Sequence, residues 1–300
     1  MNKITSLIFS TSFKYFLFHP YLYIIFKLKI LFLKYKREAE TNTRDNTKID
    51  IFIPCGLKDI PTLSLTIQSI QKHVMHTINM VYIVSPDNEK VRQIAKQNNA
   101  VWIDEKSIAP IDITSITYTT YNHVDRSSWL YQQLIKLSCT RLSKNRFILV
   151  QDADTILIRN QKYIENEHIV INCSSNLPHI PYFNTYYKLL RKQILPIYNT
   201  TSHSACIDRK VLEELKNKLE KYHSLPWYRV IINYINKNEF SYISDYELYG
   251  QYLIHNKDNK IILKHWKNNA LPRSLISNLD FLEKQYDIYF KSISFHSYLT

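Results

Sequence analysis

Residues 146–154 read RFILVQDAD, an apolar run that ends in two acidic residues separated by one alanine. An uninterrupted apolar run of this length is typical of a strand buried on both faces of a sheet. Residues i and i+2 of an extended segment point the same way, so the carboxylates of Asp152 and Asp154 face one site. Two buried carboxylates are costly unless a cation neutralises them. The stretch therefore predicts a ligand site directly after a core strand.

An alternation of strands and helices surrounds this stretch and predicts an α/β fold. Helical and extended periodicities follow one another along the first half of the chain, which indicates a mostly parallel sheet flanked by helices. In the first half we expect strands at 49–55, 80–86, 100–104 and 146–154, and helices at 62–75, 88–98 and 127–143. In the second half we expect strands at 168–172, 203–208, 260–266 and 292–299, and helices at 209–222, 226–237 and 245–255.

Composition and length favour one large domain and exclude several classes of protein. The chain has 300 residues, enough for a single α/β domain, which we place at 49–300. Only two glycines are present, Gly56 and Gly250, so neither a G-x-G-x-x-G loop nor a Walker loop can be written. Four widely spaced cysteines without a C-x-x-C pattern argue against a zinc site or a disulfide framework, and they indicate a reducing, cytoplasmic compartment.

The N-terminal segment 1–37 is basic and aromatic. The formal net charge of the chain is +13, and the segment contributes seven basic residues with no acid before Glu38. Its longest uncharged run, 15–26, is too short to span a bilayer, which suits a segment lying on an anionic membrane surface. The alternative is a helix packed on the protein's own core. Residues 38–48 are polar and are expected to form a linker, so deleting 1–36 should leave the remaining domain soluble.

Polar residues at the strand ends and along one helix are candidates for binding a ligand. Ligands of α/β sheets bind at the carboxyl ends of the strands, which makes Pro54 and Asp87 candidates beside the acid pair. In RSSWLYQQLIKL, a spacing of 0, 3, 4 and 7 places four polar or aromatic side chains on one helical stripe, which fits the wall of a cleft and equally fits a solvated helix face. These four are Trp129, Gln132, Gln133 and Lys136.

A second acidic pair and three histidines complete the candidate site. Asp245 and Glu247 begin an expected helix, where an acid serves either as a cap or as a general base. We assign the base to Glu247, whose side chain is longer, and the cap to Asp245. His203, His265 and His296 are each candidates for a metal ligand or a donor contact, and equally for ordinary structural histidines.

The motifs IPCGLKD, W-x-x-QQ-x-x-K-L, QDAD, T-S-H-x-x-x-x-x-R and SDYELYG occur in this order over 49–300. Together they resemble a family of uncharacterised bacterial proteins assigned to the GT-A glycosyltransferases and found with surface-polysaccharide and lipooligosaccharide genes. The resemblance implies a GT-A-like fold that uses a nucleotide-sugar donor and a glycan or glycolipid acceptor. It implies that Mn²⁺ or Mg²⁺ is bound by Asp152, Asp154 and His296, with His265 as the second choice for the histidine. It also implies that His203 faces the donor and that Asp245 and Glu247 lie on the acceptor side.

Other functions fit parts of the sequence. A metal-dependent nucleotidyl- or phosphosugar-transferase also uses two carboxylates, but such enzymes usually need a glycine-rich phosphate loop. A non-catalytic membrane adaptor gives no reason for acids at the end of a buried strand. Nucleic-acid binding is not expected, because the basic residues are concentrated in an aromatic segment. We therefore expect a peripheral enzyme on the cytoplasmic face of the plasma membrane.

Overall fold

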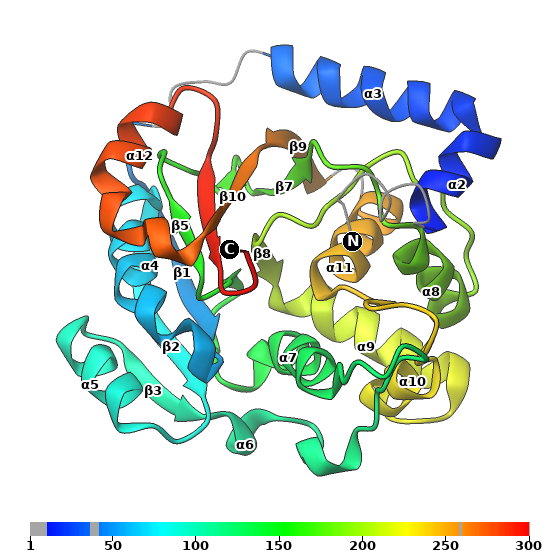
Figure 1. Cartoon of the computed structure of the whole chain (residues 1–300), viewed down its shortest axis with the longest axis horizontal. Helices are drawn as coiled ribbons and strands as arrows, with labels where there is room; N and C mark the ends of the chain where they lie inside the picture. The colour runs from blue at the N-terminus through cyan, green and yellow to red at the C-terminus, as the bar shows by residue number, and fades with distance from the viewer. Residues whose placement is uncertain (1–10, 37–41, 258–259, 300) are drawn as a thin grey trace.

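A computed structural model describes residues 11–36, 42–257 and 260–299, and a mixed five-stranded sheet forms its centre (Figure 1). The strand order is β3-β2-β1-β4-β8. All neighbours pair in parallel except β8, which runs antiparallel to β4. The predicted α/β fold with a mostly parallel sheet is confirmed. The five strands are β1 (Asp45–Pro54), β2 (His76–Ser85), β3 (Val101–Asp104), β4 (Phe147–Gln151) and β8 (Ser204–Asp208).

Helices connect these strands and flank the sheet (Figure 1). The expected helix 127–143 ends at Leu137 and continues only as a 3₁₀ turn. The helices of the first half are α4 (Ile60–His73), α5 (Glu89–Gln97), α6 (Glu105–Ile108) and α7 (Ser127–Leu137), with 3₁₀ turns η1 (Leu57–Asp59), η2 (Ile113–Ser115) and η3 (Cys139–Arg141). Those of the second half are α8 (Ile180–Leu190), α9 (Arg209–His223), α10 (Trp227–Asn233), α11 (Asp245–Asn256), η5 (Arg273–Asn278) and α12 (Leu279–Tyr286).

Two three-stranded sheets lie beside the central one. The first has the order β10-β11-β5, and the second has the order β6-β7-β9. Because β5 follows β4 after a short turn and pairs with β11, the C-terminal strand reaches the end of β4. Their bounds are β5 (Thr155–Leu157), β6 (Ile164–Glu165), β7 (His168–Ser174), β9 (Ile261–Trp266), β10 (Asn268–Pro272) and β11 (Ser292–His296).

The N-terminal segment forms two helices, α2 (Thr11–Phe18) and α3 (Pro20–Tyr35), which are bent by 103° at the break between them. Proline at the first position of α3 fits there because that position needs no intrahelical donor. α3 lies against β9, and its buried Phe26, Ile30 and Leu33 join the main core. Among the described residues no single helix is long and apolar enough to cross a bilayer, although α2 and α3 meet that requirement together.

The structure corrects one expectation about the N-terminal part and changes the basis of another. The linker expected at 38–48 overlaps the central sheet, because β1 begins at Asp45, and residues 37–41 lie outside the described part. Deleting 1–36 would also remove the inner side of α3 from the core, so a soluble remainder is no longer expected. Residues 1–10 and 37 of the expected membrane segment lie outside the described residues.

A close helix contact explains one of the two glycines. Gly250 lies inside α11, and a Cβ placed there would come within 2.6 Å of Thr200 Cβ. Thr200 is buried and holds α11 through a hydrogen bond from its hydroxyl to the carbonyl of Tyr246 (3.1 Å). Gly250 thus allows α11 to approach the loop that leads into β8, which sets the position of Asp245 and Tyr246 relative to the end of β4.

Candidate active site

The turn that follows β4 is anchored by its backbone. Every residue of β4 is buried, and the chain leaves the sheet at Asp152. The carbonyl of Ala153 accepts hydrogen bonds from the hydroxyls of Thr62 (2.9 Å) and Thr66 (2.8 Å) on α4. These two bonds hold Ala153 inward, so the carboxylates of Asp152 and Asp154 on either side of it project from a rigid turn.

Three side chains from three different elements converge on the carboxylate of Asp152. Lys136 Nζ of α7 lies 2.6 Å from Oδ1, and the Tyr246 hydroxyl of α11 donates to the same oxygen at 2.8 Å. His203 Nδ1, just before β8, lies 2.9 Å from Oδ2. The Lys136 ammonium also lies 4.2 Å from the centre of the Tyr246 ring, a cation–π distance. The sequence predictions for Asp152, Lys136 and His203 therefore concern residues that meet at one point.

His203 adopts a strained backbone conformation. Its φ is +60°, in the left-handed region of backbone conformation that residues other than glycine rarely occupy. In this conformation its carbonyl accepts from Asp152 N at 3.0 Å, while its ring reaches the Asp152 carboxylate. Such strain is kept only where the surroundings enforce it, and it is concentrated at functional sites.

The charges of this group keep each other ionised. Burial alone would raise the pKa of Asp152, but Lys136 and His203 outweigh it and hold that pKa well below its usual range. Burial alone would lower the pKa of Lys136, but Asp152 and Asp245 outweigh it and raise that pKa. Burial likewise lowers the pKa of His203, and the hydrogen bond and charge of Asp152 raise it by more. The site therefore contains a buried ammonium and an imidazole with increased affinity for a proton.

Asp154 and His296 form a second pair on the other side of the turn. His296 Nδ1, at the end of β11, lies 2.9 Å from Asp154 Oδ2, and Phe295 N donates to the Asp154 carbonyl at 2.8 Å. The ring of Tyr298 stacks on His296 with centroids 4.9 Å apart. The rings of His203 and His296 are 6.0 Å apart, so both pairs belong to one site.

The donor set at Asp154 fits a divalent cation. A carboxylate oxygen and an imidazole nitrogen, Asp154 Oδ2 and His296 Nδ1, lie 2.9 Å apart here, and both groups are ligands for divalent cations such as Mn²⁺. Asp152 is already bonded to Lys136, Tyr246 and His203. In the part of the chain that the structure describes, no three His, Cys, Asp or Glu side chains form a complete ligand group. Asp154 and His296 are thus the two side chains that would hold such a cation.

Asp245, and not Glu247, faces this group. Asp245 is buried, with its Oδ1 3.5 Å from Lys136 Nζ, and its backbone N donates to Gln133 Oε1 at 3.1 Å. Burial, together with the charge of Asp152, raises the pKa of Asp245 to about 6 against the opposing charge of Lys136. The helix cap that we assigned to Asp245 is instead Ser244, whose hydroxyl accepts from the backbone N of Glu247.

Glu247 points into the protein, away from Lys136. Its Oε2 accepts from the backbone N of Thr200 (2.9 Å) and from the hydroxyl of Thr201 (3.3 Å), and its Oε1 accepts from Gln251 (2.8 Å). Burial raises the pKa of Glu247 to about 7 against the lowering effect of these hydrogen bonds. This geometry makes Glu247 a support for the loop before His203 and does not favour the base predicted from its length.

The loop after β1 forms another wall of the site. Pro54 is the last residue of β1, and the next residues bring Gly56 beside α7, where an added Cβ would lie 3.0 Å from Gln132 Nε2. Buried Asp59 forms an ion pair with Arg273 at 2.7 Å. Arg273 also donates to the carbonyl of Phe295 at 3.2 Å, which links this loop to the strand that carries His296.

The structure does not bring the remaining candidates to the acid group. Asp87 is largely exposed and pairs with Arg92 at 2.8 Å, as expected of a surface ion pair. Trp129 is half-buried under the guanidinium of Arg126, 4.8 Å from its ring centre. His265 Nε2 lies 2.7 Å from the hydroxyl of Ser175, in the β6-β7-β9 sheet. The roles predicted for Asp87 and Trp129 in binding a donor stay predictions.

Sequence reasoning missed three residues of the site: Tyr246, Arg273 and Tyr298. Tyr246 lies between the two acids of SDYELYG, but nothing in the sequence distinguishes it from the other tyrosines of the chain. Arg273 pairs with Asp59, which lies 214 residues earlier in the sequence, and no local pattern reveals such a contact. Only Tyr298 had a local signal, since it follows His296 by two residues.

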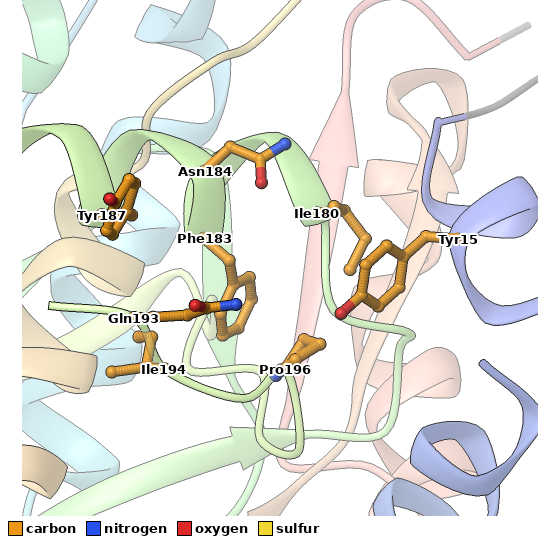
Figure 2. A pocket seen from close by; sticks show the side chains of 8 residues that line it. All are labelled: Tyr15, Ile180, Phe183, Asn184, Tyr187, Gln193, Ile194 and Pro196. Carbon is orange, nitrogen blue, oxygen red and sulfur yellow. The ribbon is translucent and has the colours of Figure 1, made fainter. Parts of the chain in front are cut away.

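A cavity of about 300 Å³ lies elsewhere, between α2 and α8. Figure 2 shows Tyr15 of α2 and Phe183 of α8 on its wall, together with Gln193 and Pro196 of the following loop. None of the predicted site residues lines this cavity, so it is separate from the group around Asp152.

Fold and site together define an α/β protein with a charged polar site at the carboxyl ends of a mostly parallel sheet, where such folds bind their ligands. The chain belongs to the family of unknown function DUF6492, whose sequence profile matches residues 46–286. A comparison with curated protein sequences found no match.

Several solved structures are similar to this fold. Mouse xyloside xylosyltransferase 1 shares 11% identity, covering 84% of this chain and 99% of that one, with a TM-score of 0.47. The galactosyltransferase LgtC with donor and acceptor sugar analogues shares 10%, covering 83% and 87%, with a TM-score of 0.43. Glucosyl-3-phosphoglycerate synthase from Mycobacterium tuberculosis, with Mn²⁺ and uridine diphosphate, shares 13%, covering 80% and 77%, with a TM-score of 0.41. At these identities and TM-scores the likeness does not extend to function, which has to follow from the site itself.

Replacing Lys136 by methionine is expected to lower the free energy of unfolding by about 3 kcal/mol. The substitution keeps the length of the side chain but leaves two carboxylates, Asp152 and Asp245, without their buried cation. Urea denaturation followed by circular dichroism measures the loss. Adding Asp245→Asn to the variant should recover part of it, because one uncompensated charge disappears.

The matched control is Lys216→Met. Lys216 is equally buried, but its carboxylate partner Glu213 is half-exposed and remains hydrated after the substitution. The control should therefore lose less stability than Lys136→Met. Equal losses for the two variants would show that Lys136 contributes only packing.

Proposed function

We propose that this protein is a glycosyltransferase that moves a sugar from a nucleotide-sugar donor to a hydroxyl of a surface-glycan acceptor. The observation that carries the proposal is the pair of carboxylates on the rigid turn after β4, with Lys136, His203 and Tyr246 at Asp152 and His296 at Asp154. A donor of this class leaves as a nucleoside diphosphate, whose charge has to be stabilised as it forms. Such a group of cations and metal ligands suits that task.

The residues divide the work of donor binding between them. A divalent cation, Mn²⁺ or Mg²⁺, would screen the charge of the leaving diphosphate when bound. Asp154 and His296 would hold it in place. Lys136 and His203 neutralise Asp152, so the turn does not repel the phosphates. Tyr246 fixes the orientation of Asp152 by donating to its carboxylate.

On the acceptor side we assign proton transfer to Asp245. As the acceptor oxygen attacks the anomeric carbon, the bond from that carbon to the diphosphate oxygen breaks and the hydroxyl proton passes to a base. Asp245 is the carboxylate beside Lys136 that is not tied to the turn, and its pKa of about 6 suits a base at neutral pH.

We also propose where the reaction takes place: on a lipooligosaccharide or capsule precursor at the inner face of the plasma membrane, with the enzyme peripheral and cytoplasmic. All four cysteines are buried and free, which accords with a reducing compartment. The chain is strongly basic, with a net charge of +13, which favours an anionic surface.

A panel of nucleotide sugars tests the proposed reaction. The purified full chain is incubated with each donor and with Mn²⁺, and the released nucleotide is identified by chromatography. Release of a nucleoside diphosphate, which stops when a chelator is added, is the expected result. Release of a nucleoside monophosphate would identify a phosphosugar transferase instead. Formation of a nucleoside triphosphate and a sugar 1-phosphate, only when pyrophosphate is added, would identify a nucleotidyltransferase.

A further inference from the structure

Helix α3 has two apolar sides with different roles. Its inner side consists of Leu22, Phe26, Ile30 and Leu33, at helical spacing, and all four are buried. Phe26, Ile30 and Leu33 belong to the main core, and the helix lies against β9. This side therefore needs no external partner and holds α3 on the domain.

The outer side of α2 and α3 is also apolar but is exposed. Leu28, Phe32 and Tyr35 are 59%, 68% and 72% exposed, although a surface helix usually turns polar residues to water. A contiguous exposed apolar patch marks a surface that binds something. We call this side the outer face; its large apolar residues are Leu17, Phe18, Tyr21, Tyr23, Ile24, Ile25, Leu28, Leu31, Phe32 and Tyr35.

The charges on the outer face have one sign. Lys14, Lys27, Lys34 and Lys36 are exposed, and the described residues 11–36 contain no aspartate or glutamate. Lys27 Nζ lies 5.3 Å from the Tyr23 ring centre, and Lys34 Nζ lies 5.3 Å from that of Tyr35. Aromatic rings and lysines with long apolar stems interleave in this way where a helix lies between lipid headgroups and acyl chains.

We propose that the outer face of α2 and α3 is a docking surface for an anionic lipid bilayer. The apolar residues enter the headgroup region and the lysines pair with lipid phosphates. Because the inner side of α3 is part of the core, α3 can lie on the bilayer while the domain stays folded beneath it. Figure 1 shows α3 along one edge of the molecule, where a flat surface can reach it.

The charge pattern favours lipid over a second copy of the chain. In a twofold dimer the same patch occupies both sides of the interface, so these lysines would face lysines with no acid on either helix to pair with them. An anionic bilayer offers phosphates at high density instead. This inference rests on the proposed membrane location and names the surface that would provide it, but it is independent of the proposed reaction, because it concerns residues outside the group around Asp152.

Vesicle flotation with the full chain tests the proposal. The variant Ile24→Ser/Leu28→Ser/Phe32→Ser removes one exposed stripe, and Lys27→Gln/Lys34→Gln/Lys36→Gln removes three charges. Against phosphatidylcholine vesicles that contain phosphatidylglycerol, the serine variant should bind at least about 100-fold more weakly, and the glutamine variant about 10-fold or more. The lysine effect should vanish on pure phosphatidylcholine and shrink in high salt.

The control is Phe281→Ser/Ile288→Ser/Tyr289→Ser, which removes three equally exposed apolar residues from the region of α12. It should bind vesicles like the wild type. Circular dichroism and sedimentation are recorded for every variant. Wild-type binding by the serine variant would overturn the proposal. A wild-type dimer that binds no vesicles, and that the serine substitutions convert to a folded monomer, would also overturn it. So would wild-type protein that resists extraction from membranes by alkaline carbonate.

Discussion

The Asp154→Asn variant is expected to lose glycosyl transfer by about 10³-fold or more while its fold survives. Asp154 lies on the anchored turn after β4 and is bonded to His296, and together they offer the two donors for a divalent cation. An amide is a far poorer ligand than a carboxylate, and metal stabilisation of a leaving group is worth several kcal/mol. The measurement is nucleoside diphosphate release at saturating Mn²⁺, compared with the wild type.

Asp280→Asn is the matched control, because Asp280 makes the same chemical change at an exposed position in the first turn of α12. It should leave both turnover and stability near the wild type. A chelator should reduce the wild type to the level of Asp154→Asn and have little further effect on that variant. If Asp154→Asn stayed fully active in metal-free buffer, the assignment of a cation to this pair would be wrong.

The central strands could be predicted where they are apolar and buried, as in the last residues of β1 and β2 and in all of β4. β4 carries its own signal in FILVQ, and its position in the chain between an amphipathic helix and the acid pair locates it in the sheet. The start of β1 was missed because it is polar and only partly buried. Residues 45–48 pair with β2 beyond the edge of the core, where side chains alternate between half-buried and exposed, so the sequence there is polar like a linker.

Two elements of the second half, α8 and β10, were not predicted. Arg191 after α8 and Ser224 after α9 take left-handed φ values of 52° and 53°, the position that glycine usually marks. Helix α8 was not recognised, whereas α9, which ends in the same way, was predicted at 209–222 from its amphipathic pattern. The strand β10 was also missed, because its residues are only half-buried and lack a clear period.

The N-terminal segment shows why composition alone could not separate two alternatives. The sequence offered a membrane-surface helix or a helix packed on the core, and both use apolar residues. The structure shows that α3 has enough apolar residues for two sides, with Phe26 buried in the core and Phe32 exposed on the outer face. Packing on the core is thus established, and the membrane contact remains the proposal that the vesicle experiment tests.

Part of the site followed from sequence and part required the fold. Asp152 and Asp154 were found from the strand that precedes them, and Lys136 from its helical stripe. The choice between Asp245 and Glu247 could not be made, because it depends on which side of α11 faces β4. The spacing Ser244-x-x-Glu247 is that of a capping box, which indicated the true cap and would have freed Asp245 for another role.

Asp245→Asn is therefore expected to cut turnover by about 10²–10⁴-fold, the usual cost of losing a general base, with donor binding nearly unchanged. The wild type should lose activity as the pH falls below about 6. Burial raises the pKa of Asp245 to about that value, and only the ionised carboxylate accepts a proton. The measurement is the pH profile of kcat, with nucleoside diphosphate affinity recorded separately.

Glu247→Gln is the comparison that decides the assignment. Glu247 accepts three hydrogen bonds, from the loop before His203 and from Gln251. In the variant, the NH₂ group of the new glutamine would face these N–H and O–H donors. We expect this variant to be less stable, since a buried donor is left without an acceptor, but to keep turnover per folded molecule within about tenfold. An inactive Glu247→Gln beside an active Asp245→Asn would return the base to Glu247. Full activity in both variants would mean that the acceptor proton leaves by another route. Among the described residues, the only other carboxylate that contacts Lys136 is that of Asp152, which is already held by three partners.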